Sequence, residues 1–97
     1  MNASRRQEIE RVLNTESERW SSLSPEQLTI KLRESQDYQI KDGDQTYQFE
    51  VALLENTDTY VHVMVAVDDS RWPYAFFPMT SSFIRQKEAE TARSSQT

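Results

Sequence analysis

The sequence predicts an α+β domain in which an N-terminal helix and a short second helix pack on one face of a four-stranded antiparallel meander. Three observations support this fold class. Apolar residues recur at helical spacing near the start of the chain, the spacing changes to a period of two near Tyr38, and Asp42-Gly43 is typical of a tight hairpin turn. We expect one domain over residues 1–85. A polar, disordered tail should follow over residues 86–97, where alanine is the only apolar residue type.

The first helix is predicted from about Ser4 to Ser22. Its apolar residues form a stripe roughly 80° wide on a helical wheel: Ile9, Val12, Leu13, Trp20 and Leu23. Ser4 is expected to cap this helix, with Gln7 as its capping-box partner. A helix of this length is marginal alone, so its stripe needs a partner surface.

Glu16 falls inside the same stripe, and two interpretations are open. In one, the carboxylate is held against the core with a raised pKa and has a functional role. In the other, its stem covers apolar surface while its head reaches water or Arg19. The second interpretation is favoured, because long charged side chains commonly cover apolar surface in this way.

A second, short helix is predicted to begin near Pro25. Ser24 is a good N-cap, proline suits the first helical position, and Gln27 completes a capping box. Leu28 and Leu32 fit a helix, although together with Ile30 they also alternate like a strand. The helical interpretation is favoured as far as Lys31.

The first hairpin is predicted at Asp42-Gly43. A two-residue loop there places Tyr38 opposite Tyr47, so Tyr38 shares a face with the apolar residues of the second strand. The third strand, Tyr60 to Asp68, alternates valines with other residues. A three-residue loop before it pairs Val63 with Val51, which puts the apolar side chains of both strands on the covered face. A four-residue loop would reverse this.

The fourth strand is predicted from Trp72 to Phe77, after a turn at 68–71. Pro73 cannot donate a ladder hydrogen bond, so this segment is expected to be an edge strand. Thr80 to Ser82 is interpreted as a loop, and Phe83-Ile84 as a segment that packs back onto the domain.

Composition excludes several classes of function. The chain has 97 residues, no cysteine, one glycine and a net charge of −5. Thiolate chemistry and glycine-rich phosphate loops are therefore excluded, and a nucleic-acid surface, which needs clustered Lys and Arg, is not expected. We predict no cofactor and no metal. The longest apolar stretch, Tyr60 to Val67, is too short to span a bilayer, so the expectation is a cytoplasmic protein without membrane contact.

Catalytic interpretations depend on the single histidine, His62. Ser81 or Ser82 could complete a triad with Asp58 or Asp68, but no nucleophile-elbow motif surrounds either serine. A histidine that alternates with valines more often lines the second face of a sheet. We therefore predict no enzymatic activity. The alternative is a small-molecule-binding or enzymatic domain that uses His62 and nearby tyrosines.

The second face of the sheet carries the predicted binding site. It is expected to gather five residues, four of them apolar or aromatic: Leu54, Tyr60, His62, Met64 and Phe77. An apolar patch on the outer face of a one-layer sheet needs an explanation. The segment 25–35 could cover it, a second copy could pair with it, or another protein or an apolar ligand could bind it. The sequence favours a small interaction or regulatory module whose partner is another protein or a second copy in a homodimer.

Overall fold

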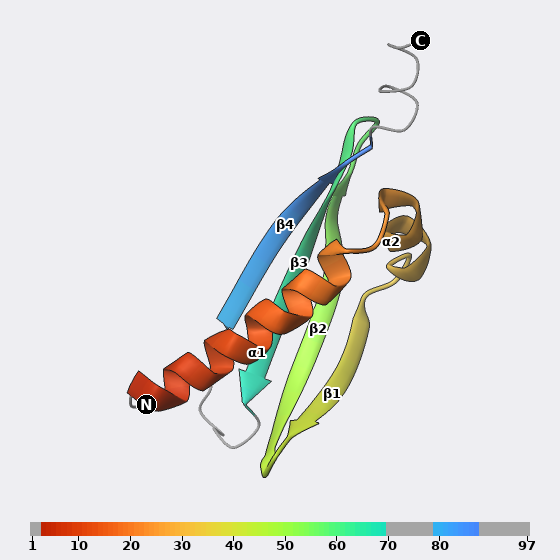
Figure 1. Cartoon of the computed structure of the whole chain (residues 1–97). Coiled ribbons are helices and arrows are strands. Elements are labelled where there is room, and N and C mark those ends of the chain that lie inside the picture. The colour runs from red at the N-terminus through yellow and green to blue at the C-terminus, as the bar shows by residue number, and fades with distance from the viewer. Residues whose placement is uncertain (1–2, 70–78, 88–97) are drawn as a thin grey trace.

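The computed structural model describes residues 3–69 and 79–87, which form two helices and a four-stranded antiparallel sheet (Figure 1). The elements follow the chain in this order: α1 (Ala3–Ser21), α2 (Pro25–Lys31), β1 (Gln36–Asp42), β2 (Gln45–Asn56), β3 (Tyr60–Asp69) and β4 (Met79–Gln86). The strands lie in the order β1-β2-β3-β4, so the sheet is a meander. The predicted α+β fold class is confirmed.

Helix α1 buries the stripe that its sequence spacing predicts. Four apolar side chains of this stripe are buried in the core: Ile9, Val12, Leu13 and Trp20. Leu23, just after the helix, is partly buried against the same core. The helix begins at Ala3, so Ser4 lies inside it instead of capping it. In Figure 1 the helix crosses the sheet diagonally on one side.

Helix α2 begins as predicted. The Ser24 side chain accepts a hydrogen bond from the Gln27 N–H, and the Gln27 side chain accepts one from the Ser24 N–H, which together form a capping box. Leu28 and Leu32 are buried in the same core as α1, whereas Ile30 is 59% exposed. Helix α2 therefore packs on the same face of the sheet as α1, and does not cover the opposite face.

The first hairpin differs from the prediction by one position. Its loop is Gly43-Asp44, with Gly43 at a φ of +67° and no positive φ at any other described residue. This is the arrangement of a type II′ turn, in which glycine occupies the first central position. Tyr38 consequently pairs with Phe49 instead of Tyr47. A change of two residues in the partner leaves every side chain on its predicted face.

The second hairpin closes more tightly than predicted. The Thr57 N–H donates to the Tyr60 carbonyl at 2.8 Å, and the Thr57 hydroxyl accepts the Tyr60 N–H at 3.0 Å. In the register set by this turn, Val61 pairs with Asn56. Continued along β2, that register would place the β3 valines opposite residues of the wrong face.

A β-bulge at Leu54 corrects this mismatch. On one side of it Glu55 pairs with His62, and on the other side Leu53 pairs with Val63, so Leu54 has no partner of its own. The extra residue changes the pairing by one and returns the β3 valines to the face that carries the apolar side chains of β2. Val63 therefore pairs with Leu53 and not with Val51, although the predicted faces are correct.

The fourth strand is not the segment that the sequence analysis selected. The predicted strand, Trp72 to Phe77, lies outside the described residues. The strand that pairs with β3 is β4, in which Phe83 lies opposite Val63 and packs partly buried against the core. The interpretation of 80–82 as a loop is wrong, because the hydroxyl side chains of Thr80 and Ser82 alternate with partly buried residues as in a strand.

Hydrogen bonds attach the end of β4 to the β2–β3 turn. Gln86 pairs with Tyr60, and the Lys87 ammonium donates to the Thr57 carbonyl at 2.6 Å and to the Asn56 side chain at 2.7 Å. Gln86 is therefore the last residue of β4, and Lys87 is attached to the β2–β3 turn. Residues 88–97 of the predicted tail lie outside the described residues.

The core lies between the two helices and one face of the sheet. On the sheet side it consists of seven buried aromatic and valine side chains, each at most 1% exposed: Tyr47, Phe49, Val51, Val61, Val63, Val65 and Val67. Burial of one such side chain contributes about 1.5–3 kcal/mol. The opposite face of the sheet, here called the outer face, carries the alternate residues of each strand.

Val63→Asp is expected to unfold the domain. The side chain is fully buried at the centre of β3, and an unpaired buried charge costs several kcal/mol against a total stability of about 5–15 kcal/mol. Ile30→Asp, on the exposed side of α2, is the matched control and should change stability by about 1 kcal/mol or less. Circular dichroism melts test this, and an unchanged midpoint for Val63→Asp would contradict the burial of this face.

Deletion of Leu54 should destabilise the protein far more than Leu54→Ala. Without the bulge, either the Thr57–Tyr60 turn is lost or β2 presents its apolar side chains to the wrong face. We expect a loss of about 2 kcal/mol or more for the deletion. Leu54→Ala keeps the bulge and removes a half-exposed side chain, so it should cost about 1 kcal/mol or less. Urea unfolding measures both, and equal midpoints would show that the bulge does not set the register.

Candidate functional site on the outer sheet face

The outer face has an apolar end near the β2–β3 turn. His62 pairs with Ile84, and the half-buried side chain of Met64 lies two residues along β3 on the same face. Ile84 is 52% exposed, and Leu54, the bulge residue next to Glu55, is 51% exposed. Two of the three exposed large apolar side chains in the described part of the chain therefore lie at this end of the outer face.

Glu55 connects the polar groups at this end. Its carboxylate accepts a hydrogen bond from the Tyr60 hydroxyl at 2.9 Å, and the same oxygen lies 3.7 Å from His62 Nδ1. The hydrogen bond and the negative charge of Glu55 raise the pKa of Tyr60, so the hydroxyl keeps its proton. This separation of Glu55 and His62 is too long for a hydrogen bond. The two side chains form an ion pair only when the imidazole carries a proton.

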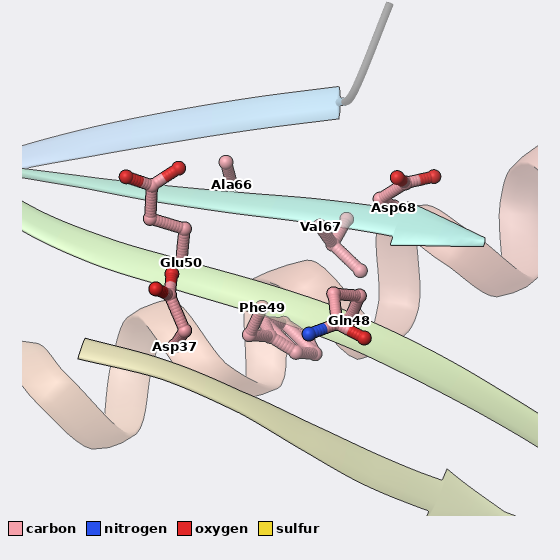
Figure 2. Close-up of a pocket in the computed structure, with 7 residues that line it drawn as sticks. All are labelled: Asp37, Gln48, Phe49, Glu50, Ala66, Val67 and Asp68. Atoms are coloured by element: carbon pink, nitrogen blue, oxygen red, sulfur yellow. The ribbon is translucent and has the colours of Figure 1, made fainter. Parts of the chain in front are cut away.

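The other end of the outer face is acidic. A shallow hollow of about 170 Å³ crosses β1, β2 and β3, and Figure 2 shows the residues that line it. Asp37 pairs with Glu50, and in Figure 2 the carboxylate of Glu50 extends toward β3, away from that of Asp37, while Asp68 lies further along β3. Asp68 Oδ1 is shielded from solvent and has no hydrogen-bond partner among the described residues. Within residues 3–69 and 79–87, no three His, Asp or Glu side chains come together as metal ligands.

The structure brings together four of the five predicted site residues. Tyr60, His62 and Met64 lie along the outer face of β3, and Leu54 is the bulge residue next to Glu55, the partner of His62. The fifth, Phe77, lies outside the described residues. Ile84 occupies the place beside His62 and was missed, because the hydroxyl-rich run before it was interpreted as a loop.

A second arrangement of polar groups lies on the other side of the sheet, where Glu16 is 7% exposed. Arg19 Nη2 donates to its carboxylate at 2.9 Å, and so does the Tyr38 hydroxyl at 2.9 Å. Tyr38 in turn accepts the Trp20 indole N–H at 2.7 Å. The interpretation in which the Glu16 head reaches Arg19 is therefore correct, and Tyr38 is a further partner that helical spacing could not indicate.

This network attaches α1 to β1. The ring of Tyr38 stacks between those of Trp20 and Phe49, at centroid distances of 6.5 and 5.6 Å. Burial is the main cause that raises the pKa of Tyr38, and its hydrogen bond to Glu16 raises it further. At the other end of the same gap, Arg11 forms an exposed ion pair with Asp42 at 2.6 Å. A hollow of about 180 Å³ lies between the two attachments.

No protein family, curated protein or solved structure matches this chain. Neither helix in the described part of the chain is long and apolar enough to cross a membrane. The geometry of the two faces is therefore the basis for a functional proposal.

Tyr38→Phe should destabilise the protein by about 1–3 kcal/mol, because it leaves the Trp20 indole N–H without a partner and removes one hydrogen bond from the buried Glu16 Oε1, which keeps its bond to Arg19. Tyr60→Phe removes a hydroxyl that only reaches the exposed Glu55, so it is the matched control and should have little effect. Urea unfolding at neutral pH measures both variants. Equal losses would show that the buried network contributes no more than a surface hydrogen bond.

The cost of Tyr38→Phe should shrink at alkaline pH. The folded state holds the Tyr38 proton more tightly than the unfolded chain, whose tyrosine pKa is about 10. The resulting stability is fully present below about pH 10 and is lost as the pH rises through the raised folded pKa. Unfolding measured from pH 8 to 11 should show the wild type converging on the variant. A constant difference would contradict the direction of the shift.

Proposed function

We propose that this protein is a non-enzymatic interaction module that binds another protein through the outer face of its sheet. The observation that carries the proposal is the pair of large apolar side chains, Leu54 and Ile84, each more than half exposed beside His62. Met and aromatic side chains, of the kind supplied by Met64 and Tyr60, are enriched in the cores of protein interfaces. Both described helices pack on the opposite face, which leaves these side chains available to a partner.

The charge of the outer face favours a basic partner. Four carboxylates lie on this face along β1, β2 and β3: Asp37, Glu50, Glu55 and Asp68. One lysine of the same strands, Lys41, lies on this face with them. Opposite charge steers a partner to such a surface and fixes its orientation. The preferred partner is therefore a segment with apolar side chains at one end and Lys or Arg at the other.

A second candidate function is the binding or conversion of a small molecule around Glu55, Tyr60 and His62. The shared contact of Tyr60 and His62 with one carboxylate oxygen favours it. The hollows of about 170 and 180 Å³ are lined by other residues, and both are smaller than the 300–1,000 Å³ or so of a ligand pocket. Protein binding therefore has the stronger support of the two functions.

The test has two stages. Proteins bound by the full chain in its native host are recovered and identified, and each candidate is then purified and titrated against the chain by calorimetry. Glu50→Lys should weaken binding by about tenfold and reduce its salt dependence, since the change reverses a charge at the acidic end. Glu18→Lys changes the net charge equally but lies on an exposed part of α1, so it is the matched control and should bind like the wild type.

The apolar end is tested by Met64→Ser in the same titration, with backbone amide shifts recorded to locate the contact. We expect weaker binding and shifts confined to the outer face of β2, β3 and β4. Binding that both variants leave unchanged, or shifts centred on the helices, would contradict the proposal. Binding of a small molecule at Tyr60 and His62 would favour the second candidate.

A further inference from the structure

The backbone N–H and carbonyl groups of β4 point alternately toward β3 and toward the opposite edge of the strand. The hydrogen bonds to β3 show which residues point to that opposite edge. The Lys87 N–H donates to the Thr59 carbonyl at 2.7 Å, in register with the pairing of Gln86 and Tyr60. Residues of an antiparallel strand alternate between those that bond to the neighbour and those that point away from it. The odd-numbered residues of β4 therefore bond to β3. The even-numbered residues direct their N–H and carbonyl groups to the other edge: Thr80, Ser82, Ile84 and Gln86.

Within the described residues, β3 is the only strand paired with β4, so this edge of the sheet is open. Long uncharged edge strands tend to pair with another strand, and proteins that avoid this place charges or proline on the edge. From Met79 to Ile84 the strand has neither. The opposite edge of the sheet, β1, is protected by Asp37, Lys41 and Asp42.

The charge of β4 also distinguishes it from the rest of the sheet. Strands β1, β2 and β3 each carry two acidic residues, whereas β4 carries none and contributes one arginine, Arg85. The whole chain has a net charge of −5, so two copies repel each other across most approaches. The edge of β4 is therefore the edge of the sheet at which a second copy would meet no carboxylate of the strand.

We propose that the outer edge of β4 pairs antiparallel with the same edge of a second copy, which joins two sheets into one. The even-numbered residues of one copy must lie opposite even-numbered residues of the other, because these residues carry the outward backbone groups. Two registers near the middle of β4 satisfy this condition: Ser82 opposite Ser82, or Phe83 opposite Phe83, which sets Ser82 opposite Ile84. In both registers the two Arg85 side chains lie toward opposite ends of the new ladder and do not repel each other. A two-fold axis makes such an interface closed, so it yields a dimer and not a fibre.

This inference goes beyond the proposed function, because it concerns the edge of the sheet and a second copy instead of the outer face and a different partner. The two are tested by different residues. Variants at Glu50 and Met64 leave the β4 edge intact, whereas backbone changes in β4 leave the acidic end of the outer face intact. Either proposal can therefore fail without the other.

The decisive measurement is amide hydrogen exchange of the full chain, read residue by residue by NMR at about 10 μM and about 500 μM, a range suited to a weak interface. The amides of Ser81, Phe83 and Arg85 should be protected at both concentrations because they bond to β3. The amides of Thr80, Ser82 and Ile84 should become at least about tenfold more protected at the higher concentration, where the mass from sedimentation should approach twice that of the monomer.

Ser82→Pro tests the ladder directly. It removes from each copy an outward N–H that β3 does not use, so proline is tolerated at this edge position while the symmetric dimer loses two central hydrogen bonds. We expect the variant to stay monomeric at about 500 μM with the melting curve of the wild-type monomer, and Ser82→Ala, which keeps the N–H, to dimerise like the wild type. If Ser82→Pro melts early, Ser82→Lys replaces it, since it sets like charges together at the dimer centre and should dissociate it at low salt.

Three results would overturn the proposal. The first is a wild type that stays monomeric at the higher concentration. The second is protection of the even-numbered amides at every concentration, which would mean that a segment of the same chain or another element already occupies the edge. The third is a dimer that persists in a folded Ser82→Pro variant and in Ser82→Lys.

Discussion

The alternation of valines in β3 is the constraint on which the rest of this structure depends. Val61, Val63, Val65 and Val67 are each at most 1% exposed, and all of them face the helices. A slip of one residue would expose all four valines. The neighbouring strands must therefore pair so that their own covered-face residues lie opposite these valines along most of β3. The tight turn at Thr57–Tyr60 sets a register that differs by one residue from this requirement. The bulge at Leu54 is the adjustment that lets the turn and the valines coexist.

This dependence explains how much of the fold could be predicted. The face of the sheet on which a strand residue lies follows from the two-residue repeat of apolar side chains. The sequence indicates the covered face for Tyr38, Phe49 and Val63, and all three pack in or against the core. The exact partner depends on how a loop closes, which involves backbone hydrogen bonds of Thr57 and the single glycine, Gly43. Both hairpins therefore differ from prediction in their partners, while the faces are as predicted. The capping box at Ser24 was predictable in full because its chemistry lies within four consecutive residues.

The fourth strand shows where local pattern fails. Its sequence, from Met79 to Gln86, alternates hydroxyl and apolar residues but contains no long apolar run, and the aromatic segment before it is a stronger strand pattern. What makes it a strand is tertiary: Phe83 opposite Val63 completes the core, and Arg85 Nε donates to the Leu23 carbonyl at 3.1 Å. The same error hid Ile84 from the candidate site. Three of the predicted site residues lie along β3, where the alternation alone placed them.

The two faces of the sheet therefore differ in kind. Toward the helices, the buried carboxylate of Glu16 is paired with Tyr38 and Arg19. On the outer face nothing in the core requires Ile84 or Leu54 to be apolar, and an isoleucine or leucine exposed there lowers solubility without adding to the packing of this domain. The exposure of these two side chains is the observation that supports the contact we propose with another molecule. The helix-covered face therefore holds the core together, and the exposed apolar side chains of the outer face support the binding role that we propose for it.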